Sequence, residues 1–220
     1  MKTLFLILFV LFSVLHLIAS WQDNRRFRAC TKPFLLIFLL LYYLAAERHP
    51  DIPLVLALLT SWIGDVLLIL KGHKWFAAGG IAFMFSHFFF ILVYLRKIDL
   101  IHQPWLLIIP VALLYYSIAL KIILSLKDNT PRAMVFPMYF YLLCNSTMNV
   151  FALMQLCSSR SSGALTAYIG AVLFYISDCT LFLVRYHANK ELIFKKHFTV
   201  MLTYLMGEFL ITYGIILLNK

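Results

Sequence analysis

Charged residues are scarce in this chain of 220 residues. They make up 13% of the sequence, whereas 63% of it is hydrophobic. Soluble domains contain about 25% charged and about 45–50% apolar residues. The shortage excludes a water-soluble globule and a disordered tail, and it leaves no stretch for a separate soluble module. We therefore expect one integral-membrane domain over residues 1–220.

Several motifs of catalysis and binding are also missing. The four cysteines form no Cys-x-x-Cys pair, so no disulfide framework is indicated. The apolar runs contain no His-x-x-x-His or Glu-x-x-His pair, which argues against an intramembrane metal hydrolase. Gly-x-Ser-x-Gly and Gly-x-x-x-x-Gly-Lys do not occur either, which argues against a serine hydrolase and a phosphate-binding loop. We expect neither a metal nor a cofactor.

The formal net charge of +10 does not indicate a nucleic-acid partner. The lysines and arginines lie in short segments between apolar runs, where they form no basic face for a phosphate backbone. Such a distribution is typical of the positive-inside bias and of contact with anionic lipid headgroups. The expected partners of the surface are membrane lipids, and nothing in the sequence indicates an oligomeric state.

Eight apolar runs predict an all-α, polytopic membrane protein, a bundle of about eight transmembrane helices. About 17–25 residues span a bilayer core. The second run is the shortest and the least certain span; it could tilt little, thin the bilayer locally or extend into its flanks. The first run could alternatively be a signal peptide, although the basic residues after it favour a retained helix. The runs cover residues 3–20, 33–46, 52–70, 75–95, 104–124, 133–157, 163–184 and 198–218.

The loop charges predict an orientation. Six of the 19 lysines and arginines fall on one side of the bundle and 13 on the other, among them Lys32 in the first loop. The positive-inside rule places the richer set in the cytosol and both termini outside it. The third and seventh runs also share an echo, residues 63–70 and 176–183, in which a small residue and Asp precede Leu-apolar-Leu. The echo makes a parallel 4+4 internal repeat possible.

Three acidic residues lie inside the runs: Asp65, Asp178 and Glu208. An ionisable side chain at the centre of a membrane helix costs at least about 2.5–3.5 kcal/mol, so their presence points to function. A buried carboxyl without a cationic partner readily holds a proton, which suits it to proton transfer. Asp65 and Asp178 would lie roughly 9 and 10 Å from one interface, so we expect an acid and a base to meet there. The alternative is hydrogen-bonding glue between helices.

Further polar residues recur at helical spacing, and together they predict one polar cavity inside the bundle. A lone buried histidine is equally consistent with a structural hydrogen bond. The candidates are Ser61 beside Asp65, then His87, then the stripe Tyr141, Asn145 and Asn149, then Ser177, and finally Tyr204, Glu208 and Thr212.

At these positions the chain resembles the YhhN-like membrane proteins, which include the lysoplasmalogenases. The most specific piece is Gly170-Ala171-x-x-Phe174-x-x-Ser177-Asp178. The remaining pieces agree in order and spacing over about residues 50–215: Ser61-x-x-Gly64-Asp65-x-x-Leu68, Phe76-x-x-Gly79-x-x-x-Phe83-x-x-x-His87, Tyr141…Met148…Ala152, and Tyr204-x-x-x-Glu208-x-x-Ile211. Glu208 departs from the family, which usually has Gln there.

The resemblance implies an eight-helix membrane hydrolase of the endoplasmic reticulum. Its substrate would be lysoplasmalogen, whose vinyl ether bond is cleaved with water to a fatty aldehyde and glycerophosphocholine or glycerophosphoethanolamine. Asp65 and Asp178 would share the catalytic roles of acid and base. The other candidates would bind substrate or water, with Asn145 and Asn149 bonded to glycerol or phosphate oxygens. The alternatives are a proton-coupled transporter of small molecules or lipids, and a catalytically inactive lipid-binding relative.

Overall fold

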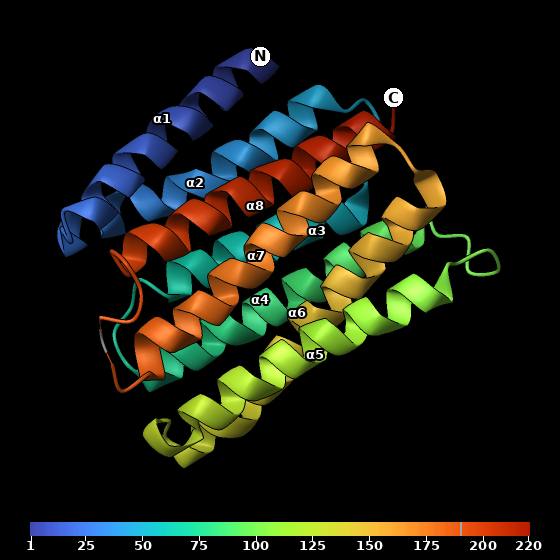
Figure 1. The fold of residues 1–220 in the computed structure, drawn as a ribbon. Helices are drawn as coiled ribbons and strands as arrows, with labels where there is room; N and C mark the ends of the chain where they lie inside the picture. The colour runs from blue at the N-terminus through green and yellow to red at the C-terminus, as the bar shows by residue number, and fades with distance from the viewer. Residues whose placement is uncertain (190) are drawn as a thin grey trace. The chain divides into compact units, whose positions relative to one another are not determined.

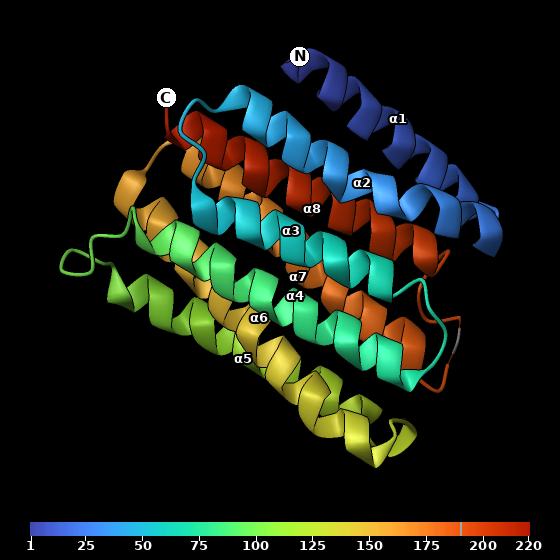
Figure 2. The ribbon, with the colours of Figure 1, turned by 180° about the vertical axis from the view of Figure 1, so that it is seen from behind.

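The computed structural model describes residues 1–189 and 191–220, and in these residues it contains eight α-helices, one short 3-10 helix and no strand (Figures 1 and 2). The expected all-α fold is confirmed. Seven of the helices are long and apolar enough to cross a membrane, as in an integral multi-pass membrane protein. The chain divides into two compact units, Met1–Phe90 and Ile91–Lys220, which are described separately.

The first unit contains α1 (Lys2–Trp21), α2 (Arg25–Ala46), α3 (Ile52–Leu67) and most of α4 (His73–Leu95). In Figure 1, α1 and α2 run side by side in opposite directions. A buried hydrogen bond of 2.8 Å joins His16 Nδ1 on α1 to Thr31 Oγ1 on α2. The first apolar run is therefore packed on its neighbour as a helix of this unit.

Helix α2 begins earlier than its apolar run. Asn24 caps it, with its side-chain oxygen accepting from the N–H of Phe27 at 3.1 Å, and the helix continues through the basic residues to Ala46. Arg and Lys are good helix formers, and their long stems can lie along apolar surface. Of the ways in which the short second run could fit a membrane, the structure shows extension into its flank, because α2 has 22 residues.

The short helix is instead α3. It has 16 residues, about 24 Å of helix, with Pro53 in its first turn. The apolar run continues to Leu70, but the helix ends at Leu67, and Gly72 follows with a φ of +115° that favours glycine. Asp65 consequently lies two residues before the end of its helix.

Glycine allows α3 and α4 to approach closely. A Cβ on Gly64 would meet the Phe83 ring at 2.6 Å, and one on Gly79 would lie 3.2 Å from the carbonyl oxygen of Gly64. Small residues at such crossings let membrane helices pack backbone to backbone. Gly64 and Gly79 therefore allow close packing of the two helices, and Gly64 directly precedes Asp65 in the sequence.

The second unit contains the end of α4, then α5 (Trp105–Leu126), the 3-10 helix η1 (Lys127–Asn129), α6 (Arg132–Ser159), α7 (Ser162–Tyr186) and α8 (His197–Leu218). Helices α7 and α8 lie side by side in both views (Figures 1 and 2). A Cβ on Gly170 would lie 2.6 Å from the backbone nitrogen of Ile211, and one on Gly214 would lie 2.5 Å from that of Ala167. The small residues of α7 and α8 thus bring the two backbones into contact.

Hydrogen bonds from tyrosine tie α5 to α7. The Tyr175 hydroxyl on α7 donates to the carbonyl oxygen of Tyr115 on α5 at 2.7 Å, and the two rings meet edge to face. These contacts fix α7, which carries Asp178.

The parallel 4+4 repeat and the orientation of the termini stay predictions.

Candidate functional site

Asp178 is the centre of a buried polar cluster in the second unit. Its side chain comes from α7, and the residue is 4% exposed. Two groups of α6 donate to its Oδ2: the Tyr141 hydroxyl at 2.8 Å and the Asn145 amide nitrogen at 2.7 Å. Because Tyr141 and Asn145 are four residues apart, one face of α6 presents both donors to the carboxyl.

Asn149 extends this cluster by one helical turn. Its Nδ2 lies 3.0 Å from the backbone oxygen of Asn145 and 3.0 Å from the Oδ1 of the same residue. Asn149 therefore orients the amide of Asn145, which in turn donates to Asp178. The structure thus brings together Tyr141, Asn145, Asn149 and Asp178 in one hydrogen-bonded chain.

The other candidates of the second unit make different contacts. The Ser177 hydroxyl donates to the backbone oxygen of Val200 at 2.9 Å and so ties α7 to α8. The Tyr204 ring packs edge to face on Phe174, with centroids 5.4 Å apart. Glu208 is fully buried on α8, and its backbone oxygen accepts from the hydroxyl of Thr212 at 2.8 Å.

Asp65 in the first unit forms an ion pair with Lys32. The Nζ of Lys32 on α2 lies 3.1 Å from Oδ1 of Asp65 on α3, and the two side chains are 14% and 2% exposed. No cationic partner for Asp65 was named from the sequence. The expectation that Lys32 lies in the first loop is wrong, because Lys32 lies inside α2. The reason is the early start of α2, which turns a flanking lysine into a helical residue beside α3.

Lys32 is the residue that sequence reasoning missed. The signal for it was present, because Asn24 can cap a helix and the following residues, Arg25 to Lys32, contain no helix breaker. A second contact fixes the same place: the Trp62 indole N–H donates to the backbone oxygen of Pro33 at 2.7 Å. Trp62 and Asp65 are one turn apart on α3, so both contacts hold it to α2.

Ser61 and His87 lie in the same unit. The Ser61 hydroxyl on α3 is 2.6 Å from that of Ser86 on α4, and both residues are fully buried. His87 follows Ser86 and is also fully buried. The structure thus pairs Ser61 with a serine that the sequence analysis did not single out. Whether Asp65 and Asp178 share a cavity stays a prediction.

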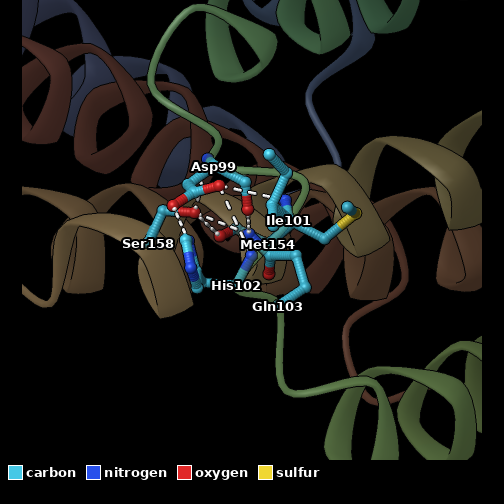
Figure 3. Close-up of polar contacts among 6 residues, drawn as sticks. All are labelled: Asp99, Ile101, His102, Gln103, Met154 and Ser158. Atoms are coloured by element: carbon cyan, nitrogen blue, oxygen red, sulfur yellow. Dashed lines mark hydrogen bonds and ion pairs between the residues drawn. The ribbon is translucent and has the colours of Figure 1, made fainter.

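A second polar cluster lies in the loop between α4 and α5 (Figure 3). Asp99 accepts from His102, with 2.7 Å between Oδ2 and Nδ1, and it also accepts from the backbone N–H of Ile101. These hydrogen bonds lower the pKa of Asp99 below its usual value. Ser158 on α6 joins the loop through the Asp99 backbone N–H at 3.0 Å and the Gln103 amide at 2.6 Å.

This loop cluster contains Ser, His and Asp but does not form a nucleophilic triad. The Ser158 hydroxyl donates to the backbone oxygen of Met154 at 3.0 Å, whereas a nucleophile would donate to the histidine. The cluster fixes the loop to the end of α6. Beside it lies a groove of 580 Å³, and none of the predicted site residues lines it: its walls are Pro104, Leu107, Leu153, Leu156, Cys157, Arg160, Ser161, Ser162 and Leu165.

No set of three or more His, Cys, Asp or Glu side chains in residues 1–189 and 191–220 is arranged to hold a metal ion. The buried ionisable groups described above are carboxyls whose partners are hydroxyl, amide and ammonium groups. Such groups can transfer protons and stabilise a developing positive charge.

Taken together, the fold and these residues define a multi-pass α-helical membrane protein with carboxyl groups buried within its helices. The sequence model of the YhhN family matches residues 27–215, most of the chain. The chain belongs to the YhhN family. Comparison with curated proteins and with solved structures finds no match.

Proposed function

We propose that this protein is a membrane-embedded hydrolase that cleaves the vinyl ether bond of lysoplasmalogen. The observation that carries the proposal is the buried carboxyl of Asp178, held by Tyr141 and Asn145 at 2.8 and 2.7 Å. Membership of the YhhN family is consistent with a hydrolase. A buried ionisable group in a membrane helix is costly and marks functional positions.

The reaction needs a proton donor and an acceptor. The donor protonates the alkenyl carbon that is not bonded to oxygen, which creates an oxocarbenium ion. Water adds to the carbon bonded to oxygen and gives up a proton to a carboxylate. The hemiacetal then loses its glycerol oxygen, which takes the remaining hydroxyl proton, and fatty aldehyde is released. One water is consumed, and the catalyst is restored when the proton on the acceptor carboxylate passes back to the donor through water.

The surroundings of the two aspartates favour different roles. Asp65 is ion-paired, because the ammonium of Lys32 lies 3.1 Å from its Oδ1. We therefore assign Asp65 to stabilising the cation and accepting the proton from water. Asp178, whose Oδ2 accepts from two neutral groups, takes the role of proton donor. That both act on one substrate is a prediction of this mechanism.

The proposal also includes the surroundings of the enzyme. The substrate is an amphiphile that reaches the protein from the bilayer, and water is the second reactant. We expect no cofactor, because protonation and hydration of a vinyl ether require only an acid, a base and water. The endoplasmic reticulum is the expected membrane.

The test is aldehyde release from lysoplasmalogen by purified protein in detergent. We expect the wild type to release aldehyde and Asp178→Asn to lose at least about 100-fold in kcat, since general acid catalysis contributes about 10²–10⁴-fold. Asp99→Asn is the matched control, because it neutralises an exposed loop carboxyl, and it should keep the wild-type rate.

Two other outcomes would contradict the proposal. Uptake of the lipid into proteoliposomes without aldehyde would indicate a transporter. Binding without either uptake or aldehyde would indicate an inactive lipid-binding relative. In that case Glu208→Gln, which introduces the residue usual in the family, would be the first variant to test for recovered activity.

A further inference from the structure

Asn149 retains an acceptor with no partner. The residue is fully buried, and among the described residues no donor lies within hydrogen-bonding distance of its Oδ1. A buried amide oxygen without a hydrogen bond is costly, by about 1–3 kcal/mol, and native proteins almost always satisfy such groups. A molecule outside the chain, either water or a ligand, is therefore expected to donate to it.

The orientation of the amide is fixed by its neighbours. The nitrogen Nδ2 lies 3.0 Å from two oxygens of Asn145, both of which are acceptors, so the NH₂ group must face them. Asn145 is oriented in the same way, because its own Nδ2 donates to Asp178. The free atom of Asn149 is accordingly an oxygen, and its ligand must be a donor.

This requirement discriminates among the groups of a lysophospholipid. In 1-alkenyl-glycerophosphocholine the phosphodiester, the ether oxygens and the quaternary ammonium offer no N–H or O–H, whereas the glycerol carries one free hydroxyl. That hydroxyl is on the carbon next to the one that bears the vinyl ether. An acceptor for it must lie close to the group that protonates the alkenyl chain, and Asn149 is one helical turn, about 6 Å, from the residue that donates to Asp178.

We propose that Asn149 Oδ1 accepts a hydrogen bond from the free 2-hydroxyl of the lysophospholipid and so selects it over lipids whose 2-oxygen is acylated. The inference rests on the proposed function. It replaces the expectation that Asn145 and Asn149 both bind glycerol or phosphate oxygens with a separate role for each residue. Asn145 is a positioning residue for Asp178, and Asn149 binds the glycerol hydroxyl rather than the phosphate.

The experiment compares two substrates, 1-alkenyl-glycerophosphocholine and its 2-O-methyl ether, which lacks the hydroxyl hydrogen. The wild type should prefer the hydroxyl substrate in kcat/KM by about 10- to 100-fold. Asn149→Leu introduces a side chain of similar size that cannot accept a hydrogen bond. It should lower kcat/KM for the hydroxyl substrate by about the same 10- to 100-fold, so that the kcat/KM values of the two substrates become about equal. Asn145→Leu should lower both rates and leave the ratio unchanged.

Gln155→Met is the matched control, because Gln155 is another buried amide of α6. It should keep the wild-type preference. The inference is wrong if the wild type hydrolyses both substrates equally, or if Asn149→Leu lowers both rates by the same factor. The second result would place Asn149 with the attacking water or with Asp178.

A binding measurement separates this inference from the proposed function. The probes are 1-O-hexadecyl-glycerophosphocholine, which has no vinyl ether, and its 2-O-methyl ether. If the wild type releases no aldehyde but binds the hydroxyl lipid about 10-fold more tightly, and Asn149→Leu removes that difference, the hydrolase proposal fails and the hydroxyl site stands. Equal binding of the two probes overturns the hydroxyl site whatever the activity.

Discussion

The ion pair of Lys32 and Asp65 offers the sharpest test of whether a buried charge in this protein is functional or structural. The two side chains are 14% and 2% exposed, so solvent screens them little. Removing one partner of a buried pair leaves an uncompensated charge, which costs about 3–5 kcal/mol. Lys32→Met and Asp65→Asn should each lower the free energy of unfolding, the former by about that amount.

The double variant Lys32→Met/Asp65→Asn should behave differently. It removes both charges of the pair, and replacing a whole buried pair by neutral groups is often neutral or stabilising. Since about 1 kcal/mol shifts the midpoint by about 2–4 °C in a chain of this size, Lys32→Met should lower it by about 6–20 °C. The double variant should recover most of that loss.

The assay pairs thermal stability with aldehyde release. Stability is measured as the fraction of monodisperse protein that survives heating in detergent, and activity is measured on the surviving protein. A stable double variant without activity would show that the Asp65 carboxylate acts in the reaction. A stable and active double variant would show that the pair only holds the two helices together. A Lys32→Met protein as stable as the wild type would refute the argument that an uncompensated buried charge is costly here.

Three further predictions concern other parts of the protein. Tyr141→Phe removes one donor to Asp178 and keeps the ring, so aldehyde release should fall by about 10-fold or more while the thermal midpoint moves little. Gly170→Ala should destabilise the protein by about 1–3 kcal/mol in a thermal melt, because its methyl group would meet the backbone of α8. The loop at Asp99 should open as the pH falls. Because folding lowers the pKa of Asp99, the carboxylate stabilises the folded loop fully above its ordinary pKa of about 3.9. This stabilisation is lost as the pH falls through the lower pKa of the folded state. Faster amide hydrogen exchange at Ile101 below about pH 4, with no change under Asp99→Asn, would verify this.

The sequence predicts the helical fold and one face of the site well, because both follow from local periodicity. Eight apolar runs correspond to eight helices. The spacing of Tyr141, Asn145 and Asn149 at four residues requires a common face on any helix, and the structure shows this face bonded to Asp178. Which neighbouring helix provides the partner of a carboxyl depends on tertiary packing, which periodicity does not encode.

Helix ends were harder to predict for a physical reason. Hydropathy identifies apolar residues, whereas a helix ends at the residue where the backbone leaves the helical conformation. Lys32 lies seven residues inside α2 although it is charged, and Leu68 to Leu70 lie beyond α3 although they are apolar. The assumption that helix and apolar run coincide therefore misplaced Lys32 in a loop and lengthened the third span.

The two aspartates illustrate two ways to keep a carboxyl inside a membrane protein. Lys32 balances Asp65 with a full opposite charge, so the pair as a whole is neutral and either member alone is costly. At Asp178 the partners are neutral hydrogen-bond donors: the Tyr141 hydroxyl and the Asn145 amide both donate to Oδ2. This difference in partners, more than burial alone, is the reason why the proposed mechanism gives the two aspartates different roles.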